Sequence, residues 1–124
     1  MNSLKIGICG VGNVGGAVLD TLEKNPEIIQ SQGGVKLDVE IVGARKGKSA
    51  VTNKNLNVVK DLREVAANKE IDVFVELIGG CDLAKDLVET AIKNGKHVVT
   101  ANKALIASHG DELFKLAKEN NVQI

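Results

Sequence analysis

The chain has 124 residues, 16 basic and 16 acidic side chains, and 44% hydrophobic residues. This length suits one domain that buries its own core. The balanced charge and the near absence of aromatic residues, with two Phe and no Tyr or Trp, argue against a nucleic-acid partner. No apolar stretch approaches the roughly 20 residues that a bilayer-spanning helix needs, so we expect no membrane partner.

The two cysteines, Cys9 and Cys81, both stand in apolar or glycine-rich surroundings. Neither has nearby His, Cys or Asp at metal-ligand spacing, so we expect no metal site. Two unclustered thiols favour core packing in a reducing compartment, and we expect a cytoplasmic protein. A redox pair remains the alternative if the fold brings the two thiols together.

A glycine-rich turn near the amino terminus separates a predicted strand from a predicted helix. Residues 4–9 form a short apolar run, and the apolar residues after the turn recur with the spacing of one helix face. Strand, glycine turn and helix in this order are typical of dinucleotide-binding folds, in which the helix start faces the diphosphate. The alternative is a tight turn without a ligand. The candidate coenzyme contacts here are Gly10, Val11, Gly12, Asn13, Val14 and Gly15.

The end of the second predicted strand, residues 35–44, indicates which coenzyme is bound. Sites for NAD place a carboxylate about 20 residues beyond the glycine turn, whereas this chain has Arg45 followed by Lys46. An arginine suits the 2′-phosphate of NADP, which it can bind through two parallel hydrogen bonds. We therefore favour NADP(H), with NAD(H) as the alternative. Arg45 and Lys46 could equally begin a solvated loop, which we expect over residues 45–57.

The rest of the chain alternates between predicted strands and helices. This alternation predicts an α/β fold of the Rossmann type, with a doubly wound, mainly parallel sheet in three αβα layers. Breaks are expected at residues 25–26 and 33–34. The later expected elements are a helix over 62–68 capped by Asp61 and Glu64, a central buried strand over 72–78, a helix ended by Gly95, a buried strand over 96–100, a helical stretch over 102–106, a separate helix from a cap at 108–111 to Asn120, and the opening of a further strand at 122–124.

Two of these strands end in residues that packing alone does not explain. Open α/β sheets bind ligands at the carboxyl ends of their strands. Glu76 lies within a buried strand and needs a partner or a raised pKa, but it has no assigned role. His97 and His109 are expected to be structural, within a strand and at a helix cap. The candidate ligand contacts at this edge are Ile78, Gly79, Gly80, Thr100, Asn102 and Lys103.

Three segments in this order resemble homoserine dehydrogenase, and specifically its amino-terminal nucleotide-binding domain. They are the Gly10–Gly15 turn, the segment Val75-Glu-Leu-Ile-Gly-Gly80, and the segment Gly95-Lys-His-Val-Val-Thr-Ala-Asn-Lys-Ala-Leu105. The last segment is the most specific of the three. The resemblance covers essentially the whole chain.

The resemblance implies NAD(P)-dependent interconversion of L-aspartate 4-semialdehyde and L-homoserine, in the route to threonine and methionine. It places the diphosphate on the glycine turn, the adenosine ribose or its phosphate on Arg45, and the coenzyme cleft along residues 78–80. Lys103 would lie at the nicotinamide end and is a candidate for assisting catalysis. In this family a second domain holds the substrate, carries the main catalytic residues and makes most of the dimer contact. We therefore expect residues 1–124 to be a coenzyme-binding fragment, inactive alone, of a homo-oligomeric enzyme.

Two other interpretations stay open from the sequence. One is a different two-domain dehydrogenase or reductase of amino acid metabolism, such as a dihydrodipicolinate reductase. The other is a nucleotide-sensing module without catalysis. Substrates tested on the intact protein, and the nature of any further domain, would distinguish them.

Overall fold

One parallel sheet organises the computed structural model, which describes residues 3–25, 34–51 and 55–124. Within these residues the strand order is β3-β2-β1-β4-β5, and every neighbouring pair is parallel. The chain therefore winds outward from β1 in both directions, which leaves a crevice between the carboxyl ends of β1 and β4. The strands are β1 (Ser3–Cys9), β2 (Lys36–Gly43), β3 (Val58–Val59), β4 (Val73–Glu76) and β5 (His97–Thr100).

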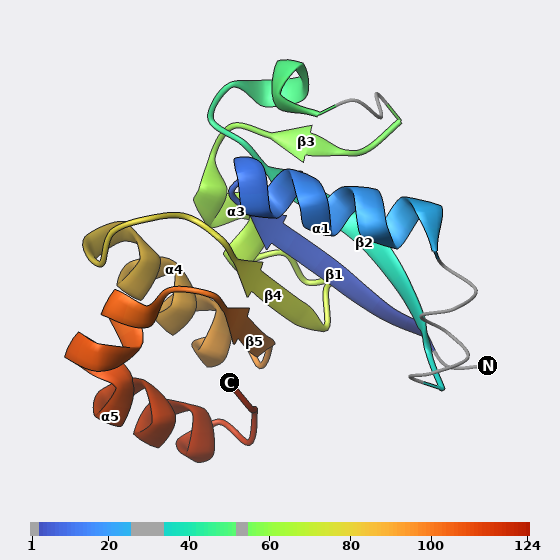
Figure 1. Ribbon diagram of the computed structural model, residues 1–124. Helices are drawn as coiled ribbons and strands as arrows, with labels where there is room; N and C mark the ends of the chain where they lie inside the picture. The colour runs from blue at the N-terminus through green and yellow to red at the C-terminus, as the bar shows by residue number, and fades with distance from the viewer. Residues whose placement is uncertain (1–2, 26–33, 52–54) are drawn as a thin grey trace.

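Helices cover both faces of this sheet (Figure 1). Helix α1 (Asn13–Lys24) packs on one face, where Leu19 joins a core with Ile8 and Val42. The other face is covered by α3 (Leu62–Ala66), α4 (Asp82–Lys93) and α5 (Lys103–Glu119), which share a larger core with the sheet. These layers confirm the predicted three-layer, doubly wound α/β fold.

Several predicted boundaries are confirmed by the local hydrogen bonds. Helix α1 ends at Lys24, and Pro26 and Gly33 lie outside the described residues. Asp61 caps α3 by accepting a hydrogen bond from the Arg63 N–H at 3.0 Å, although α3 ends two residues earlier than predicted. Gly95 follows α4 with φ of +78°, a conformation that glycine adopts without strain.

The prediction of two helical segments after residue 102 is wrong, because α5 is continuous through residues 108–111. Asn102 caps this helix by accepting a hydrogen bond from the Leu105 N–H at 3.0 Å, so Ser108 is not needed as a cap. His109 is therefore inside the helix, where its Nδ1 lies 2.6 Å from Glu112 Oε1. The apolar residues Leu105, Leu113 and Ala117 form one buried stripe across the predicted break.

Three further differences arise from the sheet edges and the long loop. The sequence predicts a buried strand over 96–100, but only one face of β5 is buried. Val98 packs in the core with α4 and α5 at 2% exposure, whereas Val99 points to the opposite face of this edge strand and is 55% exposed. Residues 122–124 form no strand, although Gln123 O accepts a hydrogen bond from the Val98 N–H at 2.8 Å. The predicted loop over 45–57 contains the short 3-10 helix η1 (Gly47–Ala50), and the two-residue strand β3 was not predicted.

Candidate coenzyme-binding site

The carboxyl ends of four strands meet at one edge of the sheet. Cys9 at the end of β1 lies opposite Gly43 of β2 and Glu76 of β4, and Glu76 lies opposite Thr100 of β5. Two hydrogen bonds extend this pairing beyond β1. The Gly10 N–H donates to Gly43 O at 3.0 Å, and the Leu77 N–H donates to Cys9 O at 2.9 Å. The glycine turn is therefore fixed between the segments that follow β2 and β4.

Gly10 and Gly12, the first two glycines of the turn, differ in how much space the protein leaves for a side chain. Gly10 has φ of +99°, and a Cβ atom there would lie 2.8 Å from the Leu77 carbonyl and 2.9 Å from Ile78 Cγ2. Gly10 is thus required by the fold itself. At Gly12, the residue before α1, a Cβ atom would meet nothing within 4 Å. Gly12 therefore keeps open space at the start of α1, and as the N-cap residue it makes no side-chain hydrogen bond to the helix.

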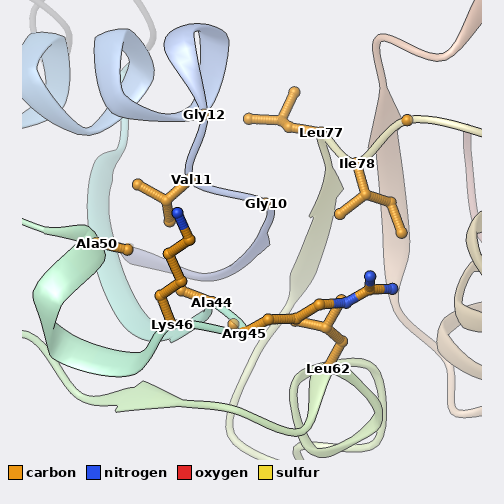
Figure 2. A pocket seen from close by; sticks show the side chains of 12 residues that line it. Gly10, Val11, Gly12, Ala44, Arg45, Lys46, Ala50, Leu62, Leu77 and Ile78 are labelled. Atoms are coloured by element: carbon orange, nitrogen blue, oxygen red, sulfur yellow. The ribbon is translucent and has the colours of Figure 1, made fainter.

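A cavity of about 360 Å³ opens beside this turn (Figure 2). The charged residues that line it, among those described, are Arg45 and Lys46, both cations and both exposed. Figure 2 shows Arg45 extending toward the side of Leu62 and Ile78, whereas Lys46 extends toward the glycine turn. Open space at Gly12, backbone N–H groups at a helix start and two cations fit the diphosphate and sugar of a dinucleotide.

A second cavity of about 340 Å³ lies beside the first and is lined on its far side by Ala101, Asn102 and Lys103. Residues 77–79 line both cavities. We call these three residues the shared strip. A dinucleotide has two nucleoside halves joined by a diphosphate, and two adjoining cavities with a shared wall match that shape.

Glu76 is fully buried and its carboxylate is hydrogen-bonded at both oxygens. Oε2 accepts from the Ile78 N–H at 2.9 Å, and Oε1 accepts from the Thr100 hydroxyl. Burial raises the pKa of the Glu76 carboxyl, although hydrogen bonds from Thr100, Ile78 and Asn102 act in the opposite direction. The sequence predicts a partner or a raised pKa for Glu76, and the hydrogen bonds from Ile78 and Thr100 supply the partners.

Thr100 and Asn102 use their polar groups within the protein. The Thr100 hydroxyl accepts a hydrogen bond from the Asn102 N–H at 3.0 Å. The Asn102 side-chain amide donates to Gly80 O, in addition to capping α5. Of the two cavities, Asn102 lines the second, and Thr100 and Gly80 line neither.

Both cysteines are free thiols in the structure. Cys9 is buried, and burial together with the charge of Glu76 raises the pKa of its thiol to about 12. His97 is exposed at the start of β5, where its Nδ1 accepts a hydrogen bond from the Gln123 N–H at 3.1 Å. The described segments contain no cluster of three or more His, Cys, Asp or Glu side chains suited to a metal ion. In the same segments no helix is both long and apolar enough to span a bilayer.

The structure thus gathers most of the predicted site residues at one edge. Gly10, Val11, Gly12, Arg45 and Lys46 line the first cavity, Ile78 and Gly79 line both, and Asn102 and Lys103 line the second. Residues 13–15 form the first turn of α1. Sequence reasoning missed lining residues that come from four separate segments, namely Gly43, Ala44, Ala50, Leu62 and Leu77. Small residues at the end of β2 were the available signal for the first two.

The fold and this site define a Rossmann-type dinucleotide-binding domain. The protein family described as "Homoserine dehydrogenase, NAD binding domain" matches residues 10–124. The chain belongs to this family, and its coenzyme is a nicotinamide dinucleotide.

Individual relatives agree with this membership. The chain is 49% identical to a homoserine dehydrogenase from Pseudomonas aeruginosa over 98% of its length, but spans only 28% of that protein. A crystal structure of a homoserine dehydrogenase from Thiobacillus denitrificans superposes with a TM-score of 0.90 at 39% identity, covering 98% of this chain and 28% of that one. A hyperthermophilic archaeal homoserine dehydrogenase in complex with NADPH has a TM-score of 0.78 at 26% identity, covering 98% of this chain and 43% of that one.

Proposed function

We propose that this chain is the coenzyme-binding part of an enzyme that interconverts L-aspartate 4-semialdehyde and L-homoserine. The observation that carries this proposal is the open start of α1 at Gly12, beside a cavity lined by Arg45 and Lys46. Family membership supports the substrate pair. The nicotinamide coenzyme supplies or accepts the hydride, while this chain binds and orients it. Another dehydrogenase, or a sensor without catalysis, is not favoured by the relatives.

The remaining parts of the proposal concern the protein beyond residues 1–124. The relatives are far longer than this chain, and we propose that a further domain binds the substrate and forms the oligomer contact. The isolated chain should then bind coenzyme without turnover. A role in threonine and methionine synthesis and a cytoplasmic location complete the proposal.

A chimera tests the activity directly. We expect residues 1–124, joined to the remaining part of the Pseudomonas aeruginosa relative, to reduce aspartate semialdehyde with NADPH. The isolated chain should show no turnover. A folded chimera that binds NADPH but does not turn over this substrate would contradict the proposed activity.

We further propose a preference for NADP(H), with Arg45 and Lys46 at the 2′-phosphate. Both cations are exposed at the end of β2 and line the first cavity, and a guanidinium binds phosphate through paired hydrogen bonds. The archaeal relative was solved with NADPH, so this fold accepts a coenzyme that carries the 2′-phosphate.

Replacing Arg45 with alanine should weaken NADPH binding about tenfold or more, because a hydrogen bond to a charged group contributes roughly 1.5–3 kcal/mol. NADH lacks the 2′-phosphate, so its affinity should change by less than about twofold. Both affinities can be measured by coenzyme fluorescence, since the chain has no Trp or Tyr.

The matched control is Lys93→Ala, which removes an exposed cation at the end of α4. It should leave both affinities unchanged. Equal losses for NADPH and NADH in the Arg45 variant would remove Arg45 as the selector between the two coenzymes.

Lys103 is proposed to act at the nicotinamide end of the site. It is the first residue of α5 and is exposed beside the second cavity. A cation at a helix amino terminus opposes the helix dipole, so its position is unfavourable for the helix itself. Its ammonium is suited to stabilise negative charge that develops on the substrate oxygen.

Replacing Lys103 with glutamine should leave the stability of the chain unchanged or raise it by about 0.3–1 kcal/mol, because the unfavourable charge is removed. Turnover by the chimera should fall on the order of 100-fold. Urea unfolding and steady-state rates measure the two effects, with Lys115→Gln on the exposed part of α5 as the control. An unchanged rate would exclude Lys103 from catalysis.

A further inference from the structure

One buried charge at this edge of the sheet has no part in the contacts proposed so far. Glu76 is 0% exposed, and transferring a carboxylate from water into a protein interior is unfavourable unless hydrogen bonds compensate. Each of its oxygens has such a partner, Ile78 on one side and Thr100 on the other. The carboxylate therefore joins the segment after β4 to the end of β5.

The connection continues from Thr100 to the start of α5. The Thr100 hydroxyl donates to Glu76 and accepts from the Asn102 N–H at 3.0 Å. The Asn102 side chain then makes two hydrogen bonds. Its Oδ1 caps α5 by accepting from the Leu105 N–H, and its Nδ2 donates to Gly80 O. We call Glu76, Thr100 and Asn102 the carboxylate clasp.

The clasp holds two parts of the site in fixed relation. It fixes the shared strip through two hydrogen bonds. One is to Ile78, within the strip, and the other is to Gly80, the residue after it. It also fixes the first residue of α5, because Asn102 immediately precedes Lys103. Both parts border the second cavity, whereas Arg45 and Lys46 in the first cavity make no contact with the clasp among the interactions described.

We propose that Glu76 is a positioning residue which, through Thr100 and Asn102, orients the shared strip and Lys103 for the nicotinamide half of the coenzyme. This inference rests on the proposed function and assigns the second cavity to that half. The adenosine half is bound mainly by Arg45 and Lys46 at the opposite end, so we expect it to depend less on the clasp, although the shared strip also lines the first cavity. A purely structural clasp would instead affect the binding of both halves alike.

Replacing Thr100 with valine tests this inference, because valine keeps the shape of the side chain and removes its hydroxyl. Calorimetry would compare NADPH with 2′-phospho-ADP-ribose, which is the same ligand without nicotinamide. We expect NADPH affinity to fall about five- to tenfold and the affinity for 2′-phospho-ADP-ribose to stay within about twofold. Thr100→Ser retains the hydroxyl and should restore NADPH binding.

Two more variants keep the result interpretable. Asn102→Ser retains a residue that caps helices well and removes the hydrogen bond to Gly80. It should therefore also lower the affinity for NADPH more than the affinity for 2′-phospho-ADP-ribose. Thr90→Val is the matched control, because the Thr90 hydroxyl bonds to Asp86 O within α4, outside the clasp. Urea unfolding of each variant shows which of them are folded.

The outcomes separate the inference from the proposed function. Equal losses for both ligands, or no loss for NADPH in folded Thr100→Val and Asn102→Ser, would overturn the positioning role. An unmodified chain that binds 2′-phospho-ADP-ribose as tightly as NADPH would also overturn it, because nicotinamide would then add no affinity. An unmodified chain that binds neither ligand would overturn the proposed function itself.

Discussion

Replacing Gly10 with alanine should destabilise the chain by about 3 kcal/mol or more and abolish measurable coenzyme binding. Alanine would have to adopt φ of +99°, with its Cβ 2.8 Å from the Leu77 carbonyl. Neither the backbone carbonyl nor the turn can move without breaking the hydrogen bonds that join Gly10 to Gly43 and Leu77 to Cys9. Urea unfolding followed by circular dichroism measures this loss.

Gly12→Ala is the matched control for Gly10. Its φ of −102° is accessible to any residue, and its Cβ would meet no protein atom within 4 Å. We therefore expect stability to stay within about 1 kcal/mol and coenzyme affinity to fall, because the methyl group would occupy the space proposed for the diphosphate. Equal destabilisation by the two substitutions would contradict the distinct roles assigned to these glycines.

Replacing Glu76 with alanine should destabilise the folded chain by about 3 kcal/mol in acid, where the carboxyl is protonated. The substitution leaves the Ile78 N–H without its acceptor, removes the partner of the Thr100 hydroxyl, and opens a cavity beneath the shared strip. Urea unfolding at a series of pH values measures the loss.

The pH dependence of that loss identifies its origin. Burial raises the pKa of Glu76 in the folded state, so the folded chain holds this proton more tightly than the unfolded chain. The contribution of Glu76 to stability is then complete below the ordinary glutamate pKa and declines as pH rises toward the raised value. The loss of stability in Glu76→Ala, relative to the unmodified chain, should therefore become smaller as pH rises. The stability of Glu76→Gln should rise relative to that of the unmodified chain over the same pH interval.

Glu112 provides a control of opposite sign. It is exposed, and the hydrogen bond to His109, followed by the nearby charges, lowers the pKa of its carboxyl. Its favourable contribution should be present above the ordinary glutamate pKa and decline as pH falls. A deficit for Glu76→Ala that grows with rising pH would contradict the raised pKa of Glu76.

The parts of the fold predicted correctly are those that depend on neighbouring residues. The glycine turn, the Asp61 cap and the Gly95 helix end each involve residues close together in sequence, so the pattern alone identifies them. The fold class followed from the alternation of such elements. The same reasoning failed at Ser108, where a cap-like sequence lies within a helix that Asn102 had already begun.

The parts that were missed depend on how distant segments meet. The exposure of Val99 depends on β5 being at the sheet edge, which the order of elements along the chain does not reveal. The partners of Glu76 include Thr100, which is 24 residues away. Thr100 and Asn102 stay predicted coenzyme contacts. What the sequence did not reveal is that their polar groups also hydrogen-bond other parts of the protein.

The shared strip also has a consequence for how a two-part ligand would be held. Residues 77–79 border both cavities, so the spacing between the two half-sites is set by one short backbone segment. Once one half of the dinucleotide is bound, the other half is present at its own half-site at a high effective concentration, as in chelation. This gain depends on the spacing staying constant, and the segment is anchored at Leu77 to Cys9 and at Ile78 to Glu76. A small rotation of this backbone would lower the affinity for the whole ligand while leaving each separate half almost unaffected.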